Sequence, residues 1–169
     1  KYLNVEIGLN KRADRWAGAD FWMTCAYKER LVIETIIDLS DVIVVGLDGG
    51  GLDDLFGMAV MGRDKDDRGR WYLWTKAWAH EIVLERRKEI APALLDFKDD
   101  GDLTIVKNLG EAISQAGKII KRLNNSGKLP EKHAIGMDKL GMPSMQDGLI
   151  AEGVDFEKMV AVPQGYMLS

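Results

Sequence analysis

The stretch 42–62 is the feature that most constrains the fold of this chain. Its first part, 42–47, is a short run of mostly β-branched residues that three glycines follow at 49–51, and this pattern predicts a buried central strand. An apolar pattern resumes at 55–61 after a very short connection. We therefore expect a β-hairpin, with Asp48 at the carboxyl end of its first strand.

The glycines at 46–51 do not match a nucleotide-binding loop. Such loops need a helix that opens directly after the glycines, and the spacing here fits neither glycine fingerprint. Two interpretations of Asp48 remain. It is either an acid beside an open turn, well placed to hold a divalent cation, or an ordinary turn residue, since Asp before Gly is common in hairpins. The local sequence alone favours the second interpretation.

Composition excludes several classes of protein and of site. The 169 residues can form one domain and a peripheral segment, and no apolar run approaches the roughly 20 residues of a membrane span. No signal peptide is expected. Cys25 is the single cysteine, and His80 and His133 are the only histidines, which argues against a zinc site. The net charge of −4 argues against a basic module that coats nucleic acid, but it is compatible with an enzyme that reaches nucleic acid through a metal.

The middle of the chain predicts two more elements and a less regular segment. The charged run 63–70 predicts a solvated loop and the aromatic run 71–78 a third strand, which would complete an antiparallel meander with tryptophans on both faces. The charged stretch 81–102, with Pro92, indicates a broken helix or a surface excursion that ends in a turn. Apolar residues at helical spacing predict a helix over 109–123.

The last part of the chain predicts alternating strands and helices. We expect a strand at 132–138, a helix at 143–152 and a strand at 159–163. The whole order is therefore three strands, a helix, a strand, a helix and a strand. A mixed α/β sheet accommodates this order if the first strand is central and the fourth lies parallel beside it.

That arrangement would bring two aspartates together. Asp48 and Asp138 each end a strand, and adjacent strands lie about 4.8 Å apart, so both carboxylates can reach one ion. Ligation by oxygen alone, with no His or Cys nearby, points to Mg²⁺ or Mn²⁺.

Several short segments resemble the nuclease domain of tailed-phage terminase large subunits, which has a ribonuclease H-like fold. The resemblance covers nearly the whole chain and depends on the order and spacing of the motifs. They are Val-Val-Gly-Leu-Asp at 44–48, the acids at 53–54, Gly-Asp-Leu-Thr at 101–104, Ala-Ile-Gly-Met-Asp at 134–138, and Val-Pro-Gln-Gly-Tyr-Met-Leu-Ser at 162–169.

The resemblance implies a metal-dependent endonuclease that cuts concatemeric double-stranded DNA during viral packaging. Asp48 would bridge two ions about 3.5 to 4 Å apart and Asp138 would hold one of them. Asp53 or Asp54 would give weaker outer-sphere support, and Lys139 would contact a phosphate. The implied partners are double-stranded DNA, other terminase subunits and the portal, with no membrane. The implied location is the cytoplasm of the host cell.

The resemblance also implies a division of the chain. Residues 1–40 would be the linker or tail of a preceding ATPase domain, because Leu3-Asn4 and the stretch 16–22 resemble the family's link out of that domain. No Walker A motif is present, so we expect the ATPase domain itself to be absent from this chain. Residues 41–169 would be the nuclease domain, incomplete at its C-terminus because the family's last metal-binding aspartate follows the final strand. We therefore expect this chain to be weakly active or inactive by itself.

Two alternatives stay open at this point. The first is a non-catalytic interaction domain on a ribonuclease H-like scaffold, with the acids as turn residues and the tryptophans as a docking surface. The second is half of an actin-like or sugar-kinase fold, which would bind ATP. A fold alone cannot choose among these, since one scaffold hosts many functions.

Overall fold

A computed structural model describes residues 18, 21, 24–26, 31–49, 54–138 and 142–163. Contacts divide the chain into two compact units, Lys1–Leu31 and Val32–Ser169. The second unit contains the helices and strands treated below. The assignment of residues 1–40 to a preceding domain falls largely on residues that the structure does not describe, and it stays a prediction.

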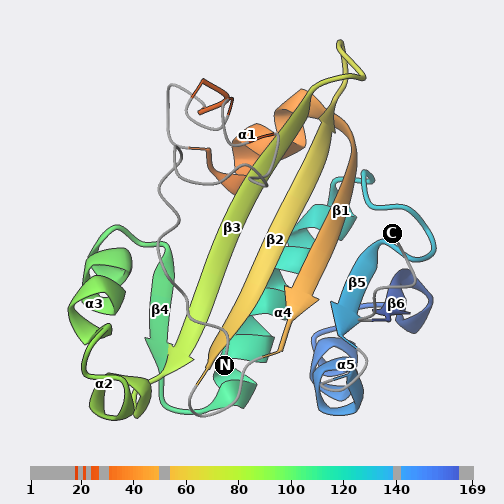
Figure 1. Ribbon diagram of the computed structural model, residues 1–169. Coiled ribbons are helices and arrows are strands. Elements are labelled where there is room, and N and C mark those ends of the chain that lie inside the picture. The colour runs from red at the N-terminus through yellow and green to blue at the C-terminus, as the bar shows by residue number, and fades with distance from the viewer. Residues whose placement is uncertain are drawn as a thin grey trace. The chain divides into compact units, whose positions relative to one another are not determined.

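The described strands form one six-stranded sheet in the order β4-β3-β2-β1-β5-β6 (Figure 1). The first three pair antiparallel, and the β1–β5, β5–β6 and β3–β4 pairs are parallel. The mixed α/β sheet with a central first strand is therefore confirmed. The strands are β1 (Ser40–Asp48), β2 (Leu55–Asp64), β3 (Trp71–His80), β4 (Leu103–Val106), β5 (Ile135–Asp138) and β6 (Met159–Val162).

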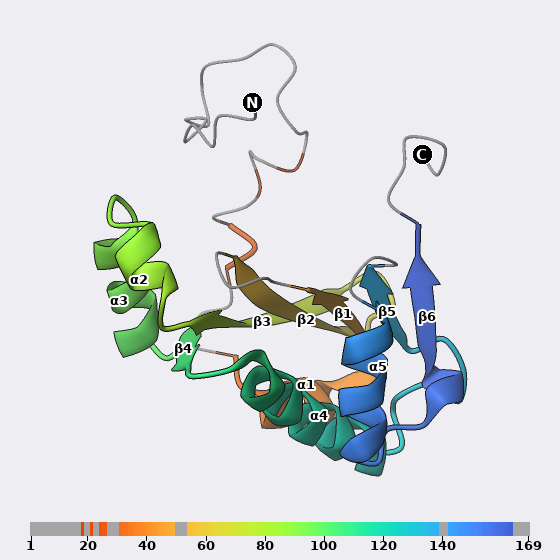
Figure 2. The same cartoon turned by 90° about the horizontal axis from the view of Figure 1, so that it is seen from below.

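Most helices of this unit lie on one side of the sheet. Figure 2 shows α1, α4 and α5 below it and α2 and α3 at the β4 margin. The helices are α1 (Ile33–Leu39), α2 (Val83–Arg86), α3 (Ala91–Asp99), α4 (Leu109–Asn125) and α5 (Met142–Ala151), with a short 3₁₀ turn, η2 (Phe156–Lys158). No helix among the described residues is long and apolar enough to cross a membrane.

Alternation along the central strands defines two faces of the sheet. In β1 the side chains of Ile43, Val45 and Leu47 are buried toward the helices, and the intervening positions are exposed or half-buried. We call the helix side the covered face and the opposite side the open face. Among the described elements from Val32 onward, only α2 and α3 cover part of the open face, where Val83 and Leu94 join a buried cluster with residues of β3 and β4.

Helix α4 begins and packs for reasons visible in its sequence. The side chain of Asn108 accepts the backbone N–H of Glu111 at 2.9 Å, which satisfies one of the free amides of the first turn. Its buried stripe packs on the covered face and includes Ala112, Ala116, Ile120 and Leu123. The buried indole of Trp78 donates to the Gln115 side chain at 2.8 Å, so α4 is anchored to β3.

A network of polar groups holds the β2–β3 hairpin, where the charged loop is confirmed. The Asp64 carboxylate is almost fully buried and accepts the Tyr72 hydroxyl and the backbone N–H groups of Asp66 and Asp67. The Tyr72 hydroxyl, and then the two amides, hold the pKa of Asp64 below its usual range. The loop is therefore anchored at its start by one carboxylate.

Two parts of the chain contain elements that were not predicted from the sequence. Helix α1 precedes the first strand, and its Ile33 and Ile36 are buried. The stretch 81–102 is indeed a broken helix, with Pro92 in the first turn of α3, and its turn contains Gly101 at φ 82°. It leads into a strand, β4, that the analysis of the sequence missed. This strand adds a parallel edge beside β3.

Candidate metal centre

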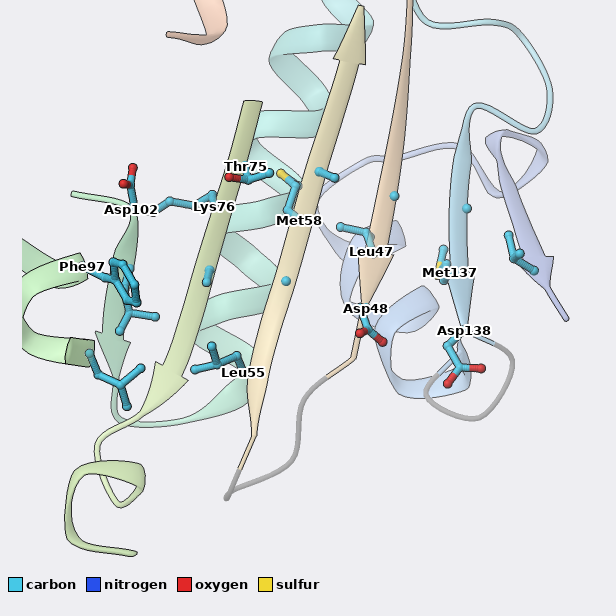
Figure 3. Close-up of a pocket in the computed structure, with 18 residues that line it drawn as sticks. Leu47, Asp48, Leu55, Met58, Thr75, Lys76, Phe97, Asp102, Met137 and Asp138 are labelled. Atoms are coloured by element: carbon cyan, nitrogen blue, oxygen red, sulfur yellow. The ribbon is translucent and has the colours of Figure 1, made fainter. Parts of the chain in front are cut away.

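Asp48 and Asp138 lie at the ends of neighbouring parallel strands. In the β1–β5 ladder Gly46 is opposite Gly136 and Leu47 is opposite Met137, and the two aspartates come next on their strands. Figure 3 shows both carboxylates at the same end of the sheet. The sheet therefore brings together the two acids that the sequence singled out, and metal binding there stays a prediction.

Both carboxylates belong to the open face. Leu47 is 4% exposed and Met137 is 1% exposed, both on the covered face, and the next residue of each strand points the opposite way. Asp48 is exposed and Asp138 is half-buried. The pair is therefore accessible to a ligand that approaches the open face.

The donor set fits a hard cation. The described residues around the two acids contribute carboxylate and backbone oxygens but no His or Cys, and oxygen ligands suit Mg²⁺ or Mn²⁺. Across the described ranges, no group of three or more His, Cys, Asp and Glu residues could share an ion. Within that part of the chain, Asp48 and Asp138 would therefore hold a cation as a pair, with water at its other positions.

The weaker candidates are placed less favourably or lie outside the described residues. Asp54 is exposed, and its carboxylate accepts the backbone N–H of Leu55 at 2.9 Å, which is the behaviour of a turn residue. It does not line the pocket that contains Asp48 and Asp138. Asp53 and Lys139 lie outside the described residues, so their predicted roles stay predictions.

Asp48 and Asp138 line a pocket of about 730 Å³ on the open face. We call this pocket the trough. Two rows of residues run across the strands as its floor. One row is Asp48, Gly57, Ala77 and Leu103, which are successive partners in the ladders from β1 to β4. The other row is Gly136, Gly46, Ala59 and Thr75, from β5 to β3.

The trough exists because its floor residues are small. A Cβ atom added at Gly46 would meet nothing within 4 Å, and one added at Gly57 would reach only the Cβ of Asp48, at 4.0 Å. Larger side chains at these positions would fill the space above the sheet. The small residues therefore keep a path open across β1, β2 and β3.

The far end of the trough is formed by α3 and by the start of β4. Phe97 of α3 forms its wall, with Leu55 on the near side (Figure 3). Leu94 of α3, which packs on β3 and β4, also lines the trough. Lys76 and Asp102 also line this end, and the Lys76 ammonium donates to the Gly101 carbonyl at 2.6 Å.

The residues of this far end were not predicted as site residues from the sequence. Asp102 was interpreted only as part of a turn and a motif, and Phe97 was not singled out. One signal was available: small residues occur in each of four predicted strands, at Gly46, Gly57, Ala59, Ala77 and Gly136. Such a repeat on one face predicts that this face lacks bulk. The wall formed by α3 had no comparable signal.

Comparison with known proteins gives one informative result. No protein-family model and no curated protein sequence matches the chain. Among solved structures, the large terminase of bacteriophage HK97 is similar, with a TM-score of 0.56 and 18% sequence identity over 80% of this chain. The similar region is 29% of the length of that terminase. At this identity the similarity concerns the fold, and the fold is a ribonuclease H-like α/β sheet that matches part of a phage large terminase.

Proposed function

We propose that this chain is the metal-dependent endonuclease part of a DNA-packaging terminase large subunit and that it cuts double-stranded DNA. The observation that carries the proposal is the pair Asp48 and Asp138, which end adjacent parallel strands on an open face. Structural similarity to a phage large terminase supports the choice of protein class. The other terminase subunits and the portal, as partners, are part of the same proposal.

In this proposal the carboxylates of Asp48 and Asp138 would hold Mg²⁺ or Mn²⁺ at the open face. Such an ion lowers the pKa of bound water and polarises a phosphoryl oxygen. The cation also offsets repulsion between the acids and the phosphates of DNA. The small floor residues Gly46 and Gly57 let a phosphate approach the carboxylates without steric conflict.

The primary test measures Mn²⁺ binding, with electron paramagnetic resonance of the free ion as the readout. Loss even of an outer-sphere partner costs a metal site about 10- to 100-fold in affinity, so we expect Asp48→Asn and Asp138→Asn each to weaken binding by at least about tenfold. Asp102→Asn is the matched control, because Asp102 lines the same trough at its far end. Its Mn²⁺ affinity should stay within about twofold of the unsubstituted chain, which is about 0.4 kcal/mol.

Two further results complete this test. Nicking of supercoiled plasmid DNA in Mn²⁺ should disappear in both aspartate variants if the chain has activity by itself. Equal Mn²⁺ affinity in Asp48→Asn, Asp102→Asn and the unsubstituted chain would contradict the proposal, because Asp48 would then contribute nothing to Mn²⁺ binding.

One observation favours the interaction domain as a second candidate. Away from the acids, the open face carries Met61, Trp71 and Leu73, which are 40%, 50% and 48% exposed. Met61 is opposite Leu73 in the β2–β3 ladder, so these apolar side chains are neighbours. Exposed apolar patches on a sheet are typical of protein contacts. Unchanged Mn²⁺ affinity in a folded Asp48→Asn variant would favour this function.

A further inference from the structure

The two ends of the trough present different groups. Figure 3 shows Asp48 and Asp138 at one end and Phe97, beside Lys76 and Asp102, at the other. Leu94 and Leu55 also line the trough, and the floor between its ends includes glycine, alanine and threonine. The Lys76 ammonium at the Phe97 end donates to the Gly101 carbonyl. A ligand that fills the trough would therefore be anionic at the acid end, where it would be bound through a cation, and would place a flat surface on Phe97 at the other end.

Phe97 is the aromatic residue at the apolar end. Its side chain is 52% exposed although it lines the trough, and Leu55 is 36% exposed. The neighbouring Leu94 is only 4% exposed and belongs to the buried cluster that fixes α3 on β3 and β4. The phenyl ring therefore extends from a fixed helix into accessible space, where it offers a surface for stacking.

The geometry of the sheet sets the distance between the two ends. A point between β1 and β5 is about 12 Å from β3 and about 17 Å from β4, if the strands are about 4.8 Å apart. The residues Asp48, Gly57, Ala77 and Leu103 form one row across these strands, so the path is direct. At about 3.4 Å per nucleotide of a stacked strand, it spans about four or five nucleotides, and fewer in an extended strand.

We propose that the α3 end of the trough binds an unstacked nucleobase on Phe97, in a DNA strand whose phosphate lies at Asp48 and Asp138. The chemistry of a nucleotide strand matches the two ends of the trough, because its phosphates need the cation and its bases stack on an aromatic surface. The volume of about 730 Å³ is within the usual range of small-ligand pockets, so the trough has room for a nucleotide. This inference rests on the proposed function for its substrate class, and it adds that the bound strand is locally unpaired.

The test measures DNA binding without cleavage. The chain 1–169 is titrated in Ca²⁺ against a fluorescein-labelled 12-nucleotide single strand and against the same sequence as a blunt hairpin duplex, with anisotropy as the readout. We expect the single strand to bind more tightly than the duplex. Stacking of one base on an aromatic ring corresponds to a change of roughly five- to 150-fold on removal of the ring, and the lower end applies to a half-exposed ring.

Three variants separate stacking from folding. Phe97→Leu keeps apolar bulk on α3 but removes the aromatic surface, so single-strand affinity should fall about fivefold or more with duplex affinity unchanged. Phe97→Trp should retain or strengthen binding. Leu95→Ala is the matched control, because Leu95 is 42% exposed on the same helix but does not line the trough. It should bind as the unsubstituted chain does.

Each result decides one of the two proposals. Equal single-strand affinity in Phe97→Leu, Leu95→Ala and the unsubstituted chain overturns the nucleobase site, even if Asp48→Asn loses Mn²⁺. A selective loss in Phe97→Leu supports the nucleobase site, even if Mn²⁺ affinity does not depend on Asp48 and the nuclease proposal fails. Tighter binding of the duplex than of the single strand also overturns the inference.

Discussion

Substitution of glycine by alanine should change the free energy of unfolding in opposite directions at two positions of neighbouring strands, one on the floor of the trough and one on the covered face. Gly46 of β1 lies on the open face, and a Cβ atom there would meet nothing within 4 Å. Gly62 of β2 lies on the covered face, where a Cβ would be 2.1 Å from the Ser40 hydroxyl oxygen and 2.9 Å from a methyl carbon of Ile36. Ser40 is 1% exposed and Ile36 is 0% exposed, so neither can move into solvent.

The magnitudes follow from these contacts. Gly46 has no positive φ among the described backbone angles, so alanine there removes only the entropic cost of glycine in a strand, about 0.5 to 1 kcal/mol. Gly62→Ala forces a methyl group into a filled core, which costs about 1 to 3 kcal/mol. The two variants should therefore differ by roughly 1.5 to 4 kcal/mol in the free energy of unfolding, although each adds one methyl group.

Urea unfolding followed by tryptophan fluorescence measures this difference. At a slope of about 2 kcal/mol per molar urea, Gly46→Ala should raise the midpoint by roughly 0.25 to 0.5 M, and Gly62→Ala should lower it by roughly 0.5 to 1.5 M. A loss of stability in Gly46→Ala as large as in Gly62→Ala would refute the reasoning. It would mean that packed atoms lie above position 46 and that the trough does not have an open floor.

Two more predictions concern the helix packing and the hairpin. Gly148→Ala would place a Cβ 2.6 Å from the Ile113 side chain, so it should separate α4 from α5 and lower stability by about 1 to 3 kcal/mol in urea unfolding. Ile113→Ala should cancel part of that loss in a double-mutant cycle, and full additivity would contradict the contact. The Tyr72 hydroxyl lowers the pKa of Asp64 in the folded state. The ionised Asp64 carboxylate therefore adds to the free energy of unfolding above about pH 4, and this addition is lost as the pH falls through the pKa of Asp64 in the folded chain. The urea midpoint should therefore decrease less between about pH 5 and 3 in Asp64→Asn than in the unsubstituted chain. An equal decrease in both would exclude Asp64 as the cause of the pH dependence.

Local patterns were sufficient to predict the central elements. The β-branched run of β1, the aromatic run of β3 and the helical period of α4 each extend over several residues, so the side-chain period is visible without tertiary information. The expected parallel pairing of the first strand with the strand that ends at Asp138 is also present. It follows from the order of elements, because few topologies accommodate a meander that is followed by alternating helices and strands.

The shorter elements could not be predicted in the same way. β4 has four residues and α1 has seven, which is too few for a period to distinguish strand from helix. β4 forms because β3 offers a free edge, and α1 is stabilised by burial of Ile33 and Ile36. Both depend on partners that are distant in the sequence.

For the site, the sequence by itself determined which residues end their strands and which positions lack side-chain bulk. Asp48, Asp138 and the small residues of the floor are visible in the printed chain, because alternation along a strand is a local property of the backbone. Only the tertiary structure decided that the small positions of β1, β2, β3 and β5 share rows and that Phe97 extends over their far end. The physical reason is that open space in a protein depends on the side chains of every neighbouring strand and helix, and those neighbours are set by long-range pairing.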